Sequence, residues 1–209
     1  MTALIIGNGS DIDKSYIEDI NIDYVICADG GLEKANKLDL RPDLILGDFD
    51  SVDPSVLENY KRLNIETVTF PSEKDYTDME LAINHAVLKG FKDIILVGAS
   101  GTRLDHTVAN MLLIEKYHKK DINIKLLDNN NLIQMVNNNM TIHFEKGYFV
   151  SIIPLSEKIE GLTLEGFKYP LNNVIIERGS TLCISNEISE NVGVIKLTKG
   201  SAIIFVSKD

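Results

Sequence analysis

Aspartates follow several short apolar runs in this sequence, and their spacing suits the binding of a divalent cation. Asp48 and Asp50 stand two residues apart directly after the run Leu44–Leu46, and Asp75 follows the next apolar run. Mg²⁺ prefers oxygen ligands and commonly links one or two carboxylates to substrate phosphates. A single aspartate is more often a turn or helix-start residue. The D-x-D pair together with Asp75 favours a functional site over three unrelated structural residues.

Six short apolar runs, separated by helix-like segments, must position these aspartates. Continuous runs rich in Ile, Val and Leu predict strands that are buried on both faces. Strand–helix alternation predicts an α/β fold with a mostly parallel sheet. The expected strands are Thr2–Ile6, Tyr24–Ala28, Leu44–Leu46, Glu66–Phe70, Ile94–Val97 and Ile122–Leu127.

Three helices are predicted between these strands. One begins at a T-x-x-E capping box formed by Thr77 and Glu80 and ends near Gly90. Pro54 is placed to open another at its first turn. A third begins near Arg103, and we expect its apolar stripe to face the sheet. That stripe consists of Leu104, Val108, Met111 and Leu112.

The carboxyl ends of parallel strands lie along one edge of a sheet, where open α/β sheets bind their ligands. Motifs that are separate in the sequence are therefore expected to converge on one crevice. The residues that follow a predicted strand in this way are Asp29, Asp48, Asp50, Asp75, Asp78 and the segment Gly98–Gly101.

The segment from Gly98 to Thr102 joins a predicted strand to the helix that begins near Arg103. Small residues let the backbone approach a ligand, and helix N-termini attract phosphate. The segment matches neither the G-x-G-x-x-G dinucleotide fingerprint nor a P-loop. Taken alone, it is a weak signal, because glycine between a strand and a helix usually marks an ordinary turn.

Several polar side chains near these motifs have two readings. Arg103, His106 and Asn110 share one helix face, which either meets a ligand or lies in solvent. Lys74 either pairs with phosphate or is exposed. Asp105 either belongs to the site or interacts with the helix dipole from the first turn.

The chain changes character after Asp128. Residues 130–209 contain short β-rich runs separated by glycines, with no helical period, which predicts a small antiparallel sandwich or barrel. We therefore expect an α/β domain over residues 1–129 and an all-β domain over residues 130–209. The β-rich runs are Tyr148–Ile153, Val174–Ile176, Leu182–Ile184, Val194–Leu197 and Ala202–Val206.

Charge and composition narrow the classes of function. The 209 residues include 31 acidic and 21 basic side chains, and residues 1–129 alone carry 23 acidic and 14 basic ones. Such a surface repels phosphate backbones, so we expect no nucleic-acid partner. No apolar run approaches the length of a membrane span, and no signal peptide is apparent. Cys27 and Cys183 are expected to be buried thiols in a cytoplasmic protein.

Five motifs, in this order and spacing, resemble the thiamine pyrophosphokinase family, in its bacterial form. The resemblance covers essentially the whole chain and implies transfer of a pyrophosphoryl group from ATP to thiamine, giving thiamine diphosphate and AMP. It also implies a Mg²⁺ requirement, and a homodimer with the thiamine site at the subunit interface. The motifs are Ala28–Gly31, Gly47–Ser51, Asp75–Asp78, Gly101–His106 and Ser185–Glu187, and Phe167–Leu171 adds to the bacterial likeness.

The same resemblance implies roles for individual residues. Asp48, Asp50 and Asp75 would bind Mg²⁺. Independently of the resemblance, a carboxylate near the hydroxyl could accept its proton as a general base, and the sequence does not choose between Asp75 and Asp78. Asp29, Ser185 and Asn186 would contact thiamine. The segment Gly7–Gly9, which is more variable in the family, receives little weight. ATP would be surrounded by Lys74, Thr77, Asp78, Gly98, Ser100, Gly101, Arg103, Asp105 and His106.

Two alternative functions stay open at this point. A Mg²⁺-dependent phosphohydrolase could use Asp48 of the D-x-D pair as its nucleophile, although such enzymes usually carry this motif after the first strand rather than the third. A nucleotide- or thiamine-sensing protein would need the same acidic cluster without catalysis. Detection of AMP release that depends on thiamine distinguishes the kinase from both.

Overall fold

The computed structural model describes residues 1–49, 52, 54–136 and 138–209, so Asp50 lies outside the described residues. The chain divides into two compact units, Met1–Asn129 and Asn130–Asp209. Within the described ranges, no helix has both the length and the apolar character needed to cross a membrane.

The first unit is built on a sheet in which neighbouring strands run parallel, as the sequence predicted. Its strands follow the spatial order β4-β3-β2-β1-β5-β6. The strands β2, β3 and β4 are added in turn outward from β1, and the chain then returns to place β5 on the other side of β1. The strand order therefore reverses at β1. The strands are β1 (Thr2–Ile6), β2 (Tyr24–Ala28), β3 (Leu44–Gly47), β4 (Glu66–Thr69), β5 (Asp93–Val97) and β6 (Asn123–Leu127).

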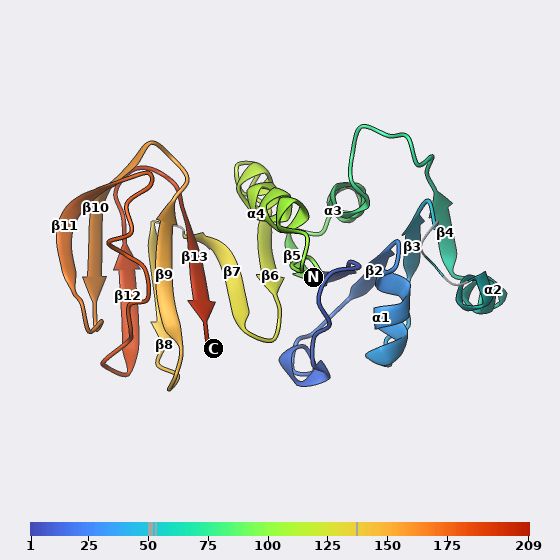
Figure 1. The fold of residues 1–209 in the computed structure, drawn as a ribbon, viewed down its shortest axis with the longest axis horizontal. Helices are drawn as coiled ribbons and strands as arrows, with labels where there is room; N and C mark the ends of the chain where they lie inside the picture. The colour runs from blue at the N-terminus through green and yellow to red at the C-terminus, as the bar shows by residue number, and fades with distance from the viewer. Residues whose placement is uncertain (50–51, 53, 137) are drawn as a thin grey trace. The chain divides into compact units, whose positions relative to one another are not determined.

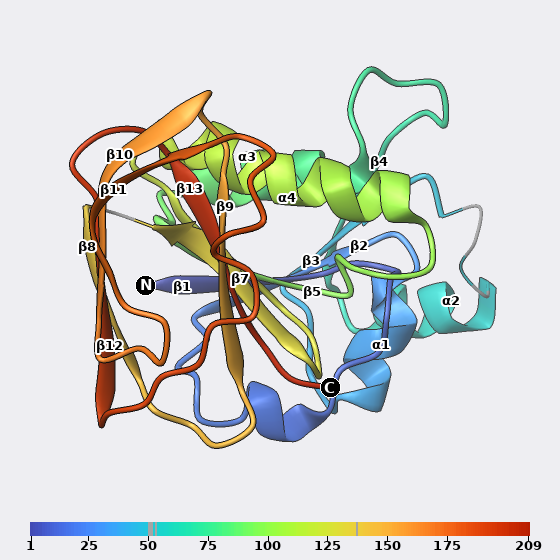
Figure 2. The same ribbon diagram turned by 60° about the vertical axis from the view of Figure 1, so that its left-hand side comes forward.

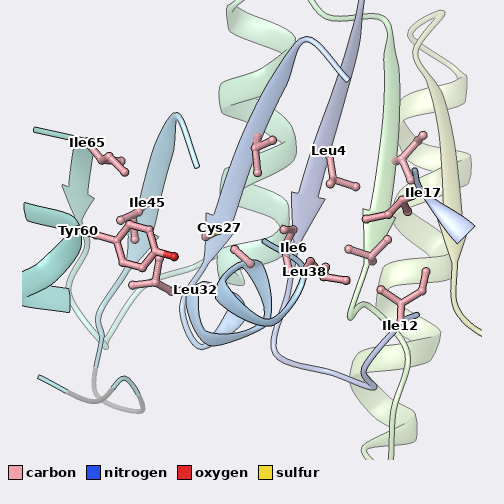
Figure 3. Close-up of a cluster of buried hydrophobic side chains, with 14 of the residues drawn as sticks. Leu4, Ile6, Ile12, Ile17, Cys27, Leu32, Leu38, Ile45, Tyr60 and Ile65 are labelled. Atoms are coloured by element: carbon pink, nitrogen blue, oxygen red, sulfur yellow. The ribbon is translucent and has the colours of Figure 1, made fainter. Parts of the chain in front are cut away.

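Helices cover both faces of this sheet (Figure 1). On one face lie the short η1 (Lys14–Tyr16), α1 (Gly31–Lys37) and α2 (Pro54–Arg62), and on the other lie α3 (Asp78–Leu88) and α4 (Leu104–His118). Apolar side chains from the sheet and from the segments that cover the first of these faces form a buried core, drawn in Figure 3. Burial on both faces explains why β1, β2, β3 and β5 are continuous apolar runs, whereas the edge strand β4 is partly exposed.

The start of α3 was predicted correctly. Thr77 is the N-cap residue, and its hydroxyl accepts a hydrogen bond of 3.3 Å from the backbone N–H of Glu80. Gly90 follows the helix with φ of +91°, a conformation that glycine adopts without steric cost. The cap therefore positions Asp78 in the first turn of α3.

The predicted core face of α4 is wrong. Leu104, Val108 and Leu112 have 72%, 52% and 51% of their surface exposed, whereas Leu113 and Ile114 are buried. Polar Thr107 and Asn110 are also buried on this helix. The apolar stripe read from the sequence thus faces away from the core of its own unit.

In the second unit, β7, β13 and β9 pair antiparallel in that order, and β11-β10-β12-β8 form a four-stranded antiparallel sheet (Figure 2). Apolar side chains from both sheets share one buried cluster, as in a β-sandwich. The predicted all-β class is confirmed. The strands are β7 (Asn131–Val136), β8 (Asn139–His143), β9 (Phe149–Pro154), β10 (Lys158–Glu165), β11 (Leu171–Glu177), β12 (Val192–Lys196) and β13 (Ala202–Ser207).

One predicted strand of this unit is absent. Leu182–Ile184 forms a turn, with Leu182 and Ile184 exposed and only Cys183 buried. The run is apolar enough to suggest a strand, but it is too short to form a ladder between the turns on either side. Conversely, β7, β8 and β10 were not predicted, because their polar residues interrupt the apolar pattern.

Candidate active site

A cavity of about 760 Å³ opens at the carboxyl ends of the parallel strands. The loops after β1, β2, β3 and β5 line it, together with the segment before α3 and the first turns of α4. This is the edge at which open α/β sheets bind ligands. The residues singled out from the sequence that line it are Asp29, Asp48, Lys74, Asp75, Thr77, Asp78, Gly98, Ser100, Gly101, Arg103 and His106.

The remaining four residues are not among the described residues that line the cavity. Asp105 is exposed and does not line the cavity. Asp50 is outside the described residues. Ser185 and Asn186 belong to the second unit and are described separately below.

Backbone hydrogen bonds join the loops after β1 and β5. The N–H of Gly9 donates to the carbonyl of Gly98 at 2.7 Å, and the N–H of Ser10 donates to the carbonyl of Ser100 at 2.7 Å. Both loops line the cavity. They therefore form one continuous wall of small residues.

The contact between these loops leaves no space for a side chain at Gly9. A Cβ atom there would lie 2.0 Å from the carbonyl oxygen of Ser100 and 2.6 Å from that of Gly98. The family resemblance assigns little to the segment Gly7–Gly9. Its position directly after the first strand, like that of the other motifs, was the signal that could have identified it.

Polar side chains of α4 hold the second loop in place. Asn110 donates from Nδ2 to the carbonyl of Ala99 at 2.7 Å, and Thr107 Oγ1 accepts from the N–H of Gly101 at 3.1 Å. Ser100 Oγ donates to Asp128 Oδ2 at 2.7 Å. Burial of Thr107 and Asn110 is thus explained by hydrogen bonds that orient the loop. Asn110 supports the cavity wall rather than extending the polar surface of Arg103 and His106.

Lys74 lies among the carboxylates of the cavity. Its Nζ is 2.9 Å from Asp78 Oδ1 and 3.7 Å from Asp48 Oδ2. The side chains of Lys74, Asp78 and Asp48 are 14%, 24% and 22% exposed. Partial burial makes these charge interactions stronger than those of a surface pair. The sequence left open whether Lys74 is exposed to solvent or pairs with phosphate, and its burial excludes the first of these.

Unusual backbone conformations mark the ends of β2 and β3. Asp29 has φ of +47° and Phe49 has φ of +62°, values in the left-handed region that non-glycine residues seldom adopt. The N–H of Asp29 donates to the carbonyl of Leu46 at 2.8 Å, which stabilises this conformation. Strained residues of this kind gather at functional sites, and here they flank Asp48.

Arg103 and Asp105 form an exposed ion pair. Arg103 Nη2 donates to Asp105 Oδ2 at 2.7 Å and its Nε donates to Oδ1 at 3.3 Å. Hydrogen bonding to the guanidinium lowers the pKa of Asp105 to about 2, so the carboxylate stays charged at neutral pH. Asp105 therefore orients Arg103 at the rim of the cavity.

The donor chemistry of the cavity fits Mg²⁺ bound together with phosphates. Among the described residues, no three His, Cys, Asp or Glu side chains are grouped to hold a metal ion by themselves. Mg²⁺ usually takes only one or two carboxylates and fills its shell with water and substrate phosphates. Asp78 Oδ1 is buried without a well-directed hydrogen bond from the described part of the chain, which is suited to a cation ligand.

Ser185 and Asn186 have different environments in the second unit. Ser185 is exposed with φ of +56°, and its N–H donates to Ser151 Oγ at 2.9 Å. Asn186 is only 6% exposed. Its Oδ1 accepts from the N–H of Tyr169 at 3.1 Å and its Nδ2 donates to the carbonyl of Tyr169 at 2.9 Å. The Asn186 carboxamide thus fixes the backbone at Tyr169.

Two family models match the chain, one in each unit. The thiamin pyrophosphokinase catalytic domain matches residues 19–126, and the thiamin pyrophosphokinase vitamin B1 binding domain matches residues 138–202. Thiamine pyrophosphokinase from Bacillus subtilis is 40% identical over 165 residues, which cover 78% of this chain and 77% of that protein. Thiamine pyrophosphokinase 1 from Arabidopsis thaliana is 28% identical over 79% of this chain and 71% of that protein.

Solved structures give the same result. The crystal structure of the Bacillus subtilis enzyme superposes with a TM-score of 0.92 at 34% identity, and all of both chains is covered. Thiamin pyrophosphokinase from Geobacillus thermodenitrificans gives a TM-score of 0.87 at 34% identity, covering 100% of this chain and 98% of that one. Because these models and relatives span both units, the chain belongs to the thiamine pyrophosphokinase family of enzymes.

Proposed function

We propose that this protein transfers the pyrophosphoryl group of ATP to the hydroxyl of thiamine by in-line attack on the β-phosphorus, assisted by Mg²⁺. Membership of the family supports the coarser statement, synthesis of thiamine diphosphate from thiamine and ATP. The proposal of Mg²⁺-assisted, in-line transfer depends on one observation, a cavity of about 760 Å³ lined by carboxylates, a lysine and two glycine-containing loops.

Each part of the cavity would supply one requirement of phosphoryl transfer. Such reactions depend mainly on positioning and on stabilisation of phosphate charge. The backbone of the Gly9 and Gly98 loops would let phosphates approach closely, and Lys74 and Arg103 would offset their charge. Bound Mg²⁺ would neutralise phosphate oxygens, and Asp48 and Asp75 are the described residues proposed to hold it, with Asp50 expected from the sequence.

An acidic cavity also suits the other substrate. Thiamine carries a permanent positive charge on its thiazolium ring, and carboxylates attract it electrostatically. Asp29 is the carboxylate proposed to meet it. Asp75 and Asp78 are both candidates to accept the hydroxyl proton. The ion pair with Lys74 fixes the position of the Asp78 carboxylate.

A turnover assay tests the reaction directly. The purified protein is incubated with ATP, Mg²⁺ and thiamine, and thiamine diphosphate and AMP are quantified. Equal amounts of both products support the proposal. Release of phosphate without thiamine, through a phosphorylated Asp48, would support the phosphohydrolase alternative, and tight binding of thiamine without product would support a sensor.

We propose that the active protein is a homodimer, and that the exposed stripe of α4 contributes to the interface. Leu104, Val108 and Leu112 are four residues apart and make one apolar face. Leu104 stands beside Arg103, which lines the cavity. A second copy on this face would reach the rim of the site, as expected for a thiamine site at the subunit interface.

Val108→Asp is expected to weaken the dimer at least about thirtyfold, because an interface anchor of this kind contributes about 2 kcal/mol. Sedimentation equilibrium measures the change against the 23.3 kDa mass of one chain. Leu88→Asp is the control, since Leu88 is also exposed and lies on α3. A protein that is monomeric before substitution, or a dimer that Val108→Asp leaves intact, would contradict this interface.

Ser185→Ala is expected to raise the KM for thiamine about tenfold while changing the KM for ATP less than twofold, because one lost hydrogen bond to a charged or polar ligand costs about 1.4 kcal/mol. Steady-state kinetics with each substrate varied in turn measures both constants. Ser189→Ala is the control at a nearby exposed serine. A larger effect on ATP than on thiamine would remove Ser185 from the thiamine site.

We also propose that the protein functions in the cytoplasm. Cys27 and Cys183 are both buried free thiols, and burial raises the pKa of each. Unreactive, unpaired thiols are typical of proteins that remain in a reducing compartment.

A further inference from the structure

The ammonium group of Lys74 lies where a metal-binding cavity would be expected to hold a metal cation. Its Nζ is 2.9 Å from Asp78 Oδ1 and 3.7 Å from Asp48 Oδ2. Asp48 is a proposed Mg²⁺ ligand, and all three side chains line the same cavity. A lysine that served only to bind phosphate would not need to contact two carboxylates.

The contact between Lys74 and Asp78 is close but poorly directed. Lys74 Nζ and Asp78 Oδ1 are both buried, and neither has a hydrogen bond of good geometry within the described ranges. Buried charged groups are costly unless directed hydrogen bonds satisfy them. A ligand that offers better geometry to either atom can therefore replace this contact at low cost.

We propose that Lys74 is an internal counter-ion of Asp48 and Asp78 that keeps free Mg²⁺ from the carboxylate of Asp48, so that the metal binds only together with the triphosphate. The inference rests on the proposed function and adds a mechanism of ordered binding to it. An ammonium and a divalent cation compete for the same carboxylate oxygens. When the carboxylates bind metal, the lysine is released to pair with a phosphate oxygen.

This exchange couples the two ligands thermodynamically. A negative triphosphate that takes up the Lys74 ammonium makes the carboxylates available, and thus raises the affinity for metal. By linkage, metal must raise the affinity for ATP by the same factor. Removal of the ammonium removes the competitor and most of this coupling.

Lys74→Met tests the competition without any turnover. Mn²⁺ replaces Mg²⁺ as the probe, and electron paramagnetic resonance measures free Mn²⁺ over the nucleotide-free protein. We expect Lys74→Met to bind Mn²⁺ at least about tenfold more tightly than the unsubstituted protein, because a positive charge within 4 Å of two carboxylates is gone. Affinity for ATP in EDTA, measured by calorimetry, should fall about tenfold, since the phosphate loses a cation.

Lys34→Met is a matched control. Lys34 is also 14% exposed and also forms an ion pair with a carboxylate, that of Asp11, but it does not line the cavity. We expect it to change both affinities less than twofold. Lys74→Arg keeps the positive charge, so its Mn²⁺ affinity should stay close to that of the unsubstituted protein. If Lys74 had only a structural role, the Arg and Met variants would not differ in Mn²⁺ affinity in this way.

Unchanged or weaker Mn²⁺ binding in Lys74→Met would overturn the inference. If this variant does not fold, as judged by circular dichroism, Lys74→Gln provides the same test with a polar side chain. If the unsubstituted protein synthesises thiamine diphosphate but Lys74→Met leaves the Mn²⁺ affinity unchanged, only the counter-ion role of Lys74 is rejected. Tighter Mn²⁺ binding in the variant without any synthesis by the unsubstituted protein would reject the proposed reaction instead. A protein that binds no Mn²⁺ even with ATP would reject both.

Discussion

Asp48→Asn is expected to lower turnover at least about a hundredfold and to leave the fold intact. The amide has no negative charge and offers one weaker oxygen ligand, so stabilisation of metal and phosphate charge is lost in the transition state. A hundredfold loss corresponds to about 2.7 kcal/mol. Steady-state kinetics over a range of Mg²⁺ concentrations measures it, and the apparent KM for Mg²⁺ should rise as well. Asp50→Asn is expected to act in the same way, from the sequence alone.

A control for Asp48→Asn is available in the same unit. Asp39 is a surface aspartate whose side chain is 95% exposed and lies 3.6 Å from Lys14. Asp39→Asn should keep turnover within about twofold, because exposed ion pairs contribute little. Circular dichroism shows whether each variant is folded. Undiminished turnover of folded Asp48→Asn would exclude Asp48 as a metal ligand.

Gly9→Ala is expected to weaken ATP binding at least tenfold and to lower the free energy of unfolding by about 2–4 kcal/mol. The added Cβ would lie 2.0 Å from the carbonyl oxygen of Ser100. Because that oxygen belongs to the backbone, the two loops must separate and lose their hydrogen bonds. Calorimetry with ATP and denaturation in urea measure the two effects.

Gly90→Ala separates loop contact from backbone strain. Gly90 has φ of +91°, but no atom of a non-neighbouring described residue lies within 4 Å of a Cβ built there. We expect a loss of about 1 kcal/mol in unfolding free energy and unchanged ATP affinity. If Gly9→Ala behaved like Gly90→Ala in both measurements, close approach of the loops would not matter for nucleotide binding.

Local patterns in the sequence predicted the first unit well. Strands buried on both faces must be continuous apolar runs, and a capping box requires only residues three apart, so both are readable without coordinates. The position of Asp29, Asp48 and Asp75 at one sheet edge follows from parallel pairing alone. The structure places all three along one cavity.

The stripe on α4 shows where such patterns fail. Leu104, Val108 and Leu112 have the spacing of a core face, yet they are exposed, while Thr107 and Asn110 are buried. Helical periodicity identifies an apolar face but not what covers it. Buried polar residues that hold a loop by hydrogen bonds give no signal in a hydrophobic pattern.

The sequence by itself determined the two fold classes, the edge of the sheet that carries the site, and the family. Only the tertiary structure decided that Gly9 packs against the Ser100 carbonyl, that Asn186 holds the backbone at Tyr169, and that Lys74 lies between Asp48 and Asp78. The physical reason is the range of the interactions. Periodicity and caps arise between near neighbours in the chain, whereas these contacts depend on distances and directions between segments that meet only when the chain is folded.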